Sequence, residues 1–295
     1  MDKKRIILGL GIAAVIIGSM MFVPAGSPVA LLVLLAICGL AMHEIYVLMA
    51  KGDMPASKKM GMISGLIFVA MTWWVSLLGK PDGETLLGSL PEEPNYKQLW
   101  ALLLLILIIN FFRLLVDHAN PRLAIRNALG TLFGFVYVAF FWSFFVRLYL
   151  AGDPAEPVKV AFYLLLAVKW GDAGAYFIGT KFGKHRLAPA ISPKKSWEGL
   201  FGGILFSCVV GVVWYYLNDG MLGPYKFPLC HTLILGLVLP VIGTLGDLVE
   251  SLFKRAVDVK DSGAIAHGMG GMLDMIDSLL FTAPFMYIYI QLFLD

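Results

Sequence analysis

The sequence predicts an all-α integral membrane protein, a polytopic bundle of about nine transmembrane helices. Of its 295 residues, 59% are hydrophobic and only 15% are charged, far from the composition of a soluble domain. The apolar residues also fall in runs of about 20, which is the length a helix needs to cross a bilayer. Composition and run length together exclude an ordinary soluble domain.

Nine apolar runs are long enough to span a membrane. They begin near Ile6, Val29, Gly61, Leu99, Gly130, Lys159, Gly199, Cys230 and Leu279. The first run follows a basic segment, as a secretory signal does, but it is long and lacks a clear small-x-small cleavage site, so we interpret it as an uncleaved span. Cys38, Cys208 and Cys230 show no paired spacing, which argues against a disulfide framework and against a thiolate metal site.

The basic residues indicate the orientation of the spans. Seventeen of the 23 lysines and arginines lie in the N-terminal segment and in alternate loops, five lie in the remaining loops, and Lys169 lies inside a span. Because cytoplasmic loops carry the excess of positive charge, we expect the N-terminus in the cytoplasm and the C-terminus outside. Segments 179–198 and 251–278 are then both cytoplasmic.

The chain is expected to divide into two regions. Residues 1–158 form mainly structural transmembrane helices with short or plain loops, whereas in residues 159–295 polar groups enter the spans and the loops become rich in Gly, Lys and Asp. No convincing internal repeat of the kind found in many transporters is present. The chemistry is therefore expected in the C-terminal region.

Four carboxylates on three predicted helices form a candidate metal site. Asp172 lies in KWGD, Asp247 in GTLGD, and Asp274 and Asp277 one helical turn apart in DMID. A charge inside the bilayer costs at least a few kcal/mol unless it faces a partner or a water-filled cavity. Hard oxygen ligands suit Mg²⁺, which binds through one or two carboxylates plus substrate phosphates. The alternatives are ion pairing, as of Lys169 with Asp172, and helix capping by the last two aspartates.

Glycines accompany these carboxylates. Gly243 and Gly246 precede Asp247 and are expected to let another backbone or a ligand approach closely. The string GMGG precedes the helix that carries DMID, and a glycine loop that leads into a helix start is a common anion cradle. Both features favour a site that holds a metal ion and phosphate.

The segment GTKFGKHRLAPAISPKKSWEG is a candidate polyphosphate site. Its basic and small residues are interleaved: Lys181, Lys184, Arg186, Lys194, Lys195, Gly179, Gly183, Ser192 and Ser196. Such cations can neutralise a polyphosphate, although membrane topology and attraction to anionic lipids also explain the charge. No capping box follows Ser196, which leaves Glu198 for another role. The segment lacks GxxxxGK[ST] and is therefore not a Walker P-loop.

The strings ISPKKSWEG, SLFKRAVDVKDSG and GMGGMLDMIDS together resemble the signature of the phosphatidate cytidylyltransferases, also called CDP-diglyceride synthetases. The residues that match in order and spacing are Ser251, Lys254, Arg255, Lys260, Asp261, Gly263, Gly268, Gly270, Gly271, Asp274 and Asp277. Met269 and Met275 stand where the family commonly has His and Arg, and His267 falls on the usual Pro, so we expect no catalytic histidine. The resemblance covers roughly residues 165–284.

This resemblance implies an enzyme of phospholipid biosynthesis that condenses CTP with phosphatidate to give CDP-diacylglycerol and pyrophosphate. The catalytic residues would be Asp247, Asp274, Asp277, Lys254, Lys260 and Asp261. Substrate would be bound by Ser192, Lys194, Lys195, Ser196, Glu198, Arg255, Gly270 and Gly271. Asp247 and Asp274 would hold Mg²⁺, with Asp277 and Asp172 as nearby ligands. One or two Mg²⁺ ions are expected, and a monovalent cation is an alternative for the second.

The expected location is a bacterial inner (cytoplasmic) membrane, with the active site facing the cytoplasm and membrane lipids around the spans. No nucleic-acid partner is expected, and a homodimer is left open. Two other functions also stay open. One is a cytidylyltransferase of another lipid phosphate, which would have the same nucleotide site. The other is a cation-coupled transporter, which would need polar groups through both halves of the bilayer.

Overall fold

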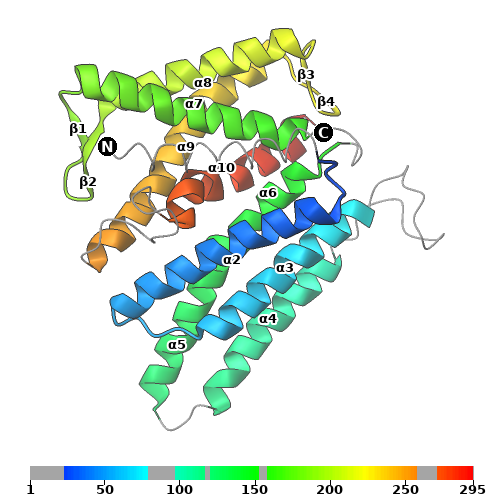
Figure 1. The fold of residues 1–295 in the computed structure, drawn as a ribbon, viewed down its shortest axis with the longest axis vertical. Helices are drawn as coiled ribbons and strands as arrows, with labels where there is room; N and C mark the ends of the chain where they lie inside the picture. The colour runs from blue at the N-terminus through cyan, green and yellow to red at the C-terminus, as the bar shows by residue number, and fades with distance from the viewer. Residues whose placement is uncertain (1–22, 79–96, 117–119, 153–157, 258–270, 295) are drawn as a thin grey trace. The chain divides into compact units, whose positions relative to one another are not determined.

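The computed structural model describes residues 23–78, 97–116, 120–152, 158–257 and 271–294 (Figure 1). These residues form two compact units. Unit 1 contains the described residues up to 152 together with 271–273, and unit 2 contains 158–257 and 274–294. The division of the chain into a structural and a catalytic region remains a prediction.

Unit 1 is built of helices, in keeping with the all-α prediction. They are α2 (Pro28–Lys51), α3 (Lys58–Leu78), α4 (Lys97–Val116), α5 (Pro121–Gly134), the π-helix η1 (Phe135–Phe140) and α6 (Phe141–Tyr149). Helix α2 begins where the sequence provides a cap, because the Ser27 hydroxyl accepts a hydrogen bond from the Ala30 amide at 3.2 Å and a proline follows Ser27 directly. The indole of Trp142 donates to the Leu34 carbonyl at 3.1 Å and so joins α6 to α2.

Unit 2 contains four long helices and two short antiparallel hairpins. Its elements are α7 (Lys159–Phe182), β1 (Arg186–Ala188), β2 (Ser192–Ser196), α8 (Trp197–Leu217), β3 (Met221–Leu222), β4 (Tyr225–Lys226), α9 (Leu229–Ala256) and α10 (Met272–Phe293), of which α10 starts among the last residues of unit 1. The all-α prediction missed both hairpins, because strands of two to five residues are too short to show an alternating pattern. The first hairpin lies within the loop expected at 179–198.

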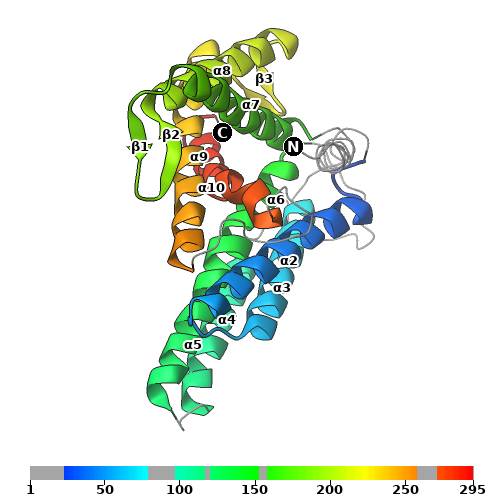
Figure 2. The ribbon, with the colours of Figure 1, turned by 60° about the vertical axis from the view of Figure 1, so that its left-hand side comes forward.

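Helices α7 and α8 lie side by side, as both ribbon views show (Figures 1 and 2). Glycines allow this contact: a Cβ on Gly174 would lie 2.8 Å from the Gly202 carbonyl oxygen, and a Cβ on Gly202 would lie 2.9 Å from the Gly174 carbonyl oxygen. Small residues let helix backbones approach in this way inside a membrane. The β1–β2 hairpin that joins the two helices is thereby held at their adjoining ends.

The described part of the chain contains six helices long and apolar enough to cross a membrane: α2, α3, the continuous series α5–η1–α6, α8, α9 and α10. Helices α4 and α7 coincide with two more of the predicted runs, and the run that begins near Ile6 lies outside the described residues. The chain is therefore an integral membrane protein. The count of nine spans and the orientation of the termini remain predictions.

The surface of α8 agrees with a lipid environment. Phe201, Leu205, Val209 and Val213 follow one another every four residues, so they share one face of the helix, and each is at least half exposed. A continuous apolar face of this kind is uncommon on soluble proteins and is typical of a surface covered by lipid or by a partner. In a membrane protein this face can contact acyl chains.

Candidate functional site

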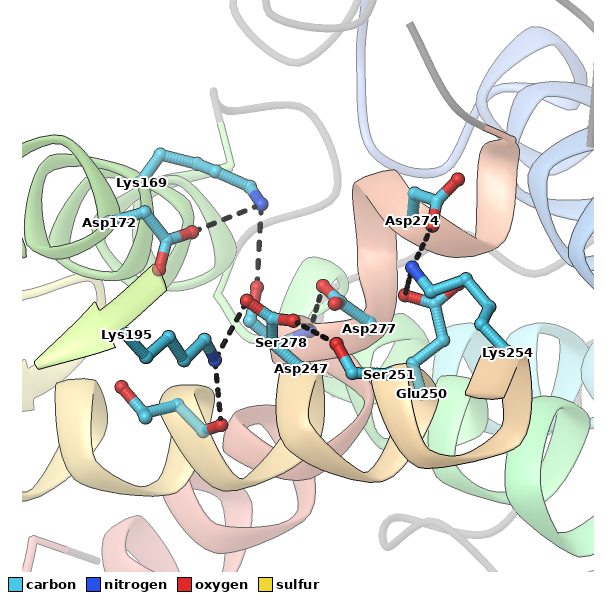
Figure 3. Close-up of polar contacts among 11 residues, drawn as sticks. Lys169, Asp172, Lys195, Asp247, Glu250, Ser251, Lys254, Asp274, Asp277 and Ser278 are labelled. Carbon is cyan, nitrogen blue, oxygen red and sulfur yellow. Dashed lines mark hydrogen bonds and ion pairs between the residues drawn. The ribbon is translucent and has the colours of Figure 1, made fainter. Parts of the chain in front are cut away.

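A cavity of about 460 Å³ in unit 2 is lined by charged side chains from three helices and one hairpin (Figure 3). The charged lining residues are Lys169 and Asp172 from α7, Lys194 and Lys195 from β2, Asp247, Glu250 and Lys254 from α9, and Asp274 and Asp277 from α10. The cavity has the size of a small-molecule site. The four predicted metal carboxylates, Asp172, Asp247, Asp274 and Asp277, thus lie around one space.

Lys254 links α9 to α10 on one side of the cavity. Its ammonium lies 2.5 Å from Asp274 Oδ1 and 3.2 Å from Glu250 Oε2. Glu250 is fully buried, and neither of its oxygens has a hydrogen-bond partner in the described part of the chain. A buried carboxylate is costly without a compensating charge, and Lys254 is the cation that lies within ion-pair distance of Glu250.

Lys195 makes the corresponding link between the first hairpin and α9. Its ammonium lies 2.8 Å from Asp247 Oδ2 and donates a hydrogen bond to the Thr244 carbonyl at 3.1 Å. The other oxygen of Asp247 accepts a hydrogen bond from the Ser251 hydroxyl at 3.2 Å. Both oxygens of Asp247 therefore have side-chain partners, and Lys195 joins the hairpin to α9.

Lys169 joins α7 to α10. Its ammonium lies 3.4 Å from Asp172 Oδ2 and 3.4 Å from the Ser278 hydroxyl, so the ion pair of Lys169 with Asp172, which the sequence left open as an alternative, is present. The amide of Ser278 donates to Asp277 Oδ1 at 2.5 Å, and the Asp277 side chain is almost completely buried. Asp277 also interacts electrostatically with Asp247 across the cavity. The carboxylates of α7, α9 and α10 thus lie around the same cavity, and together we call them the carboxylate cluster.

The charges of the lining suit a site for a cation and an anion together. Four lysines face five carboxylates, so the lining is not positive overall even though it contains the predicted phosphate-binding residues. No three side chains of His, Cys, Asp or Glu among the described residues are grouped closely enough to form a complete metal site. Asp247 and Asp274 contact lysine ammonium groups instead. The oxygen donors fit Mg²⁺ that takes part of its coordination from a bound phosphate, because Mg²⁺ rarely relies on protein ligands alone.

Other predicted residues have local roles in the structure. Ser196, which lines the cavity, caps α8 by accepting a hydrogen bond from the Gly199 amide at 3.1 Å. Glu198 pairs with His185, whose Nδ1 lies 2.6 Å from Glu198 Oε1, and Arg255 donates to the Ile191 carbonyl at 3.4 Å. Neither Glu198 nor Arg255 lines the cavity, and their roles in binding substrate remain predictions.

The remaining predicted residues fall into two groups. Ser192 and Lys194 line the cavity, whereas Gly271 directly precedes α10 and does not belong to the lining. Lys260, Asp261 and Gly270 lie outside the described residues. Their predicted roles therefore have no structural test here.

The two glycines before Asp247 differ in their surroundings. A Cβ on Gly246 would lie 2.7 Å from the backbone oxygen of Asp277, so the predicted close approach of another backbone is confirmed at this position. The atoms nearest to a Cβ on Gly243 would be side-chain carbons at 3.5 Å or more, so no other backbone comes close there, and the approach of a ligand remains a prediction. Gly246 is the glycine that lets α9 and α10 meet at the carboxylate cluster.

The predicted site residues did not include Lys169 or Glu250, although each is a charge in or at the end of an apolar run and so a functional candidate. Both belong to the cavity lining, and each lies on the same helix face as a predicted residue: Lys169 is three residues before Asp172, and Glu250 is three residues after Asp247. This spacing is the signal that could have added them to the site. The structure shows in addition that Glu250 is the more deeply buried of the two.

Comparison with known proteins gives a consistent result. The model of the cytidylyltransferase family matches residues 3–293. The chain is 44% identical over 132 residues to a phosphatidate cytidylyltransferase of Bacillus subtilis, which covers 45% of the chain and 47% of the relative. It is 37% identical over 190 residues to one of Haemophilus influenzae, 63% of each chain, and 34% identical over 208 residues to one of Thermotoga maritima, 70% and 73%. The chain thus spans less than two thirds of the first two relatives.

Proposed function

Because the chain belongs to the cytidylyltransferase family, we propose that it is a phosphatidate cytidylyltransferase, which condenses CTP with phosphatidate to give CDP-diacylglycerol and pyrophosphate. The relatives carry this name, and one structural observation supports the same activity here. A cavity within a membrane protein is lined by lysines and carboxylates from α7, α9, α10 and the first hairpin. Such a lining suits two phosphate-bearing substrates and a divalent cation.

The reaction makes modest demands on the protein. An oxygen of the lipid phosphate forms a bond to the α-phosphorus of CTP, the bond from that phosphorus to the bridging oxygen breaks, and pyrophosphate leaves with the electron pair. The lipid phosphate is already an anion, so no strong base is needed. Catalysis then consists of bringing two anions together in line and neutralising their charge. Lys194 and Lys195, which extend from β2 into the cavity, would bind the triphosphate.

The carboxylates would hold Mg²⁺. Asp247 and Asp274 lie on α9 and α10, and we assign them as ligands, with Asp277 and Asp172 as nearby ligands. When bound, Mg²⁺ would neutralise charge on the phosphates and orient them, and a second position would take another Mg²⁺ or a monovalent cation. Lys195 and Lys254, which contact Asp247 and Asp274, would then be released toward the anionic substrates.

The location of the site suits a lipid substrate. The acyl chains of phosphatidate can stay in the bilayer while the headgroup enters a cavity between helices, since polar side chains are tolerated at membrane depth where protein shields them from lipid. The excess of lysine and arginine in alternate loops supports an orientation in which the cavity opens to the cytoplasmic side of a bacterial inner membrane. CTP is present on that side.

The test is an assay of the purified protein in detergent with radiolabelled CTP, phosphatidate and Mg²⁺. We expect CDP-diacylglycerol from the wild type, loss of product with EDTA, and a fall in rate of about 100-fold or more in Asp274→Asn. Asp219→Asn is the matched control, because Asp219 is exposed in the turn before β3 and outside the cavity, and its positive φ of 51° is one that Asn also adopts.

The possible results separate the hypotheses. Full activity of Asp274→Asn would remove that carboxylate from the mechanism. Absence of product in the wild type with phosphatidate, but product with another lipid phosphate, would change the substrate and keep the nucleotide chemistry. If no lipid phosphate leads to consumption of CTP, the hypothesis of a cytidylyltransferase is overturned. The cation-coupled transporter is then the remaining hypothesis.

A further inference from the structure

Glu44 on α2 contacts the first turn of α10. Its Oε1 accepts a hydrogen bond from the Met272 amide at 3.0 Å, and its Oε2 accepts one from the Leu273 amide at 2.8 Å. Met272 and Leu273 are the first two residues of α10, and all three residues belong to unit 1. The carboxylate is only 5% exposed, so these hydrogen bonds are shielded from water.

This arrangement replaces an ordinary helix cap. The first amides of a helix have no partner within the helix, and they are usually satisfied by a side chain just before it. At α10 the acceptor instead comes from a residue 228 positions earlier in the chain. Its negative charge also suits the positive end of the helix dipole. A single carboxylate therefore satisfies two amides and fixes where α10 begins.

The residues fixed in this way are followed at once by the proposed catalytic aspartates. Asp274 lies one residue after Leu273 and Asp277 four residues after it, on the same helix. Successive residues of an α-helix are related by a fixed rise and rotation, so unwinding of the first turn changes the direction of Asp274 and leaves Asp277 at the new, uncapped end of the helix. Asp274 is the more sensitive of the two, because it belongs to that first turn.

We propose that Glu44 is a positioning residue for Asp274 and Asp277, which acts by holding the first turn of α10 in its helical conformation. The consequence for catalysis rests on the proposed function, whereas the effect on the helix does not. Glu44 touches neither the cavity nor the substrates in this proposal. Sequence reasoning missed it, because it placed no chemistry before residue 159.

Two variants of Glu44 and one control test the proposal. Glu44→Ala removes both acceptors, and Glu44→Gln keeps the size of the side chain but turns one acceptor into a donor that faces an amide. The control is Thr72→Val, because Thr72 is also buried in unit 1 but, among the described residues, its hydroxyl bonds the Phe68 carbonyl of its own helix, at 2.8 Å, and no other helix. Each protein is purified in detergent and measured by hydrogen exchange with mass spectrometry and by steady-state kinetics.

We expect faster exchange in the peptide that begins at Met272 for both Glu44 variants, and unchanged exchange there for Thr72→Val. The value of kcat should fall about 10- to 100-fold, as a misplaced catalytic group causes, while KM for CTP changes less than about twofold. Wild-type exchange of this peptide in Glu44→Gln, or wild-type kcat in a variant with faster exchange, would overturn the proposal. So would a rise in exchange across all unit 1 peptides.

These outcomes separate failure of the inference from failure of the proposed function. If the wild type makes no CDP-diacylglycerol, the proposed function fails, and the exchange data still decide whether Glu44 holds the start of α10. If the wild type is active and kcat of the Glu44 variants is unchanged, the inference alone fails. Glu44→Gln keeps the test valid where Glu44→Ala does not fold.

Discussion

The ammonium of Lys254 lies 2.5 Å from Asp274 Oδ1, which joins the last turn of α9 to the first turn of α10. The same ammonium lies 3.2 Å from Glu250 Oε2. One cation thus compensates two carboxylates on two helices, and all three side chains are largely buried (Figure 3). The position of α10 in the site therefore depends on this ion pair as well as on the backbone.

We predict that Lys254→Met lowers stability strongly. The substitution leaves Glu250 buried without a counterion, and breaking a buried ion pair from one side costs about 3–5 kcal/mol. Thermal unfolding in detergent measures the loss. The double variant with Glu250→Gln removes the uncompensated charge and should recover part of the stability, yet stay inactive. If Lys254→Met unfolds at the wild-type temperature, the carboxylates do not depend on Lys254.

Gly246→Ala is expected to impair activity, whereas Gly243→Ala is not. A Cβ at position 246 would lie 2.7 Å from the Asp277 carbonyl oxygen, so α9 and α10 must move apart beside the carboxylates. We expect a fall in kcat of about 10-fold or more. Gly243, one turn away on the same helix, has no atom closer than 3.5 Å to its added Cβ and serves as the matched control. Equal rates for the two variants would contradict the prediction.

The sequence was sufficient to predict the helices and much of the site. Apolar runs of membrane-spanning length are a strong signal, and they coincide with every long helix of the described residues. Asp172, Asp247, Asp274 and Asp277 stood out because a charge in an apolar run is costly unless it has a function or a partner. Their common position around one cavity follows from this physical constraint.

The partners of these residues were not predictable. Lys195 pairs with Asp247, 52 positions later, and Glu44 accepts hydrogen bonds from amides 228 and 229 positions away. A contact between distant segments is decided by how the helices pack, and no local pattern encodes it. The first hairpin was missed for the opposite reason: its strands are too short for a period to be visible.

Glu198→Gln is predicted to have little effect on catalysis. The Glu198 carboxylate accepts hydrogen bonds from the His185 amide at 3.2 Å and lies 2.6 Å from His185 Nδ1, at the start of the first hairpin and outside the cavity lining. We therefore expect kcat and KM for CTP within about threefold of the wild type, since solvent-exposed ion pairs contribute little. A rise of about 10-fold or more in KM for CTP would instead support a direct contact with the nucleotide.

The two adjacent lysines of β2 are predicted to act differently. Lys194 lines the cavity and makes no ion pair with another described residue, so its ammonium is available for the triphosphate. Lys194→Ala should raise KM for CTP about 10-fold, the cost of one hydrogen bond to a charged group, and leave kcat nearly unchanged.

Lys195 holds Asp247 at 2.8 Å, so Lys195→Ala should lower kcat and also shift the Mg²⁺ concentration that gives half-maximal rate. Steady-state kinetics with CTP and Mg²⁺ varied separately distinguish the two effects. Lys226→Ala, on the exposed β4 strand outside the cavity, is the control for loss of a positive charge. Identical changes in both β2 variants would show that the contact of Lys195 with Asp247 has no catalytic consequence.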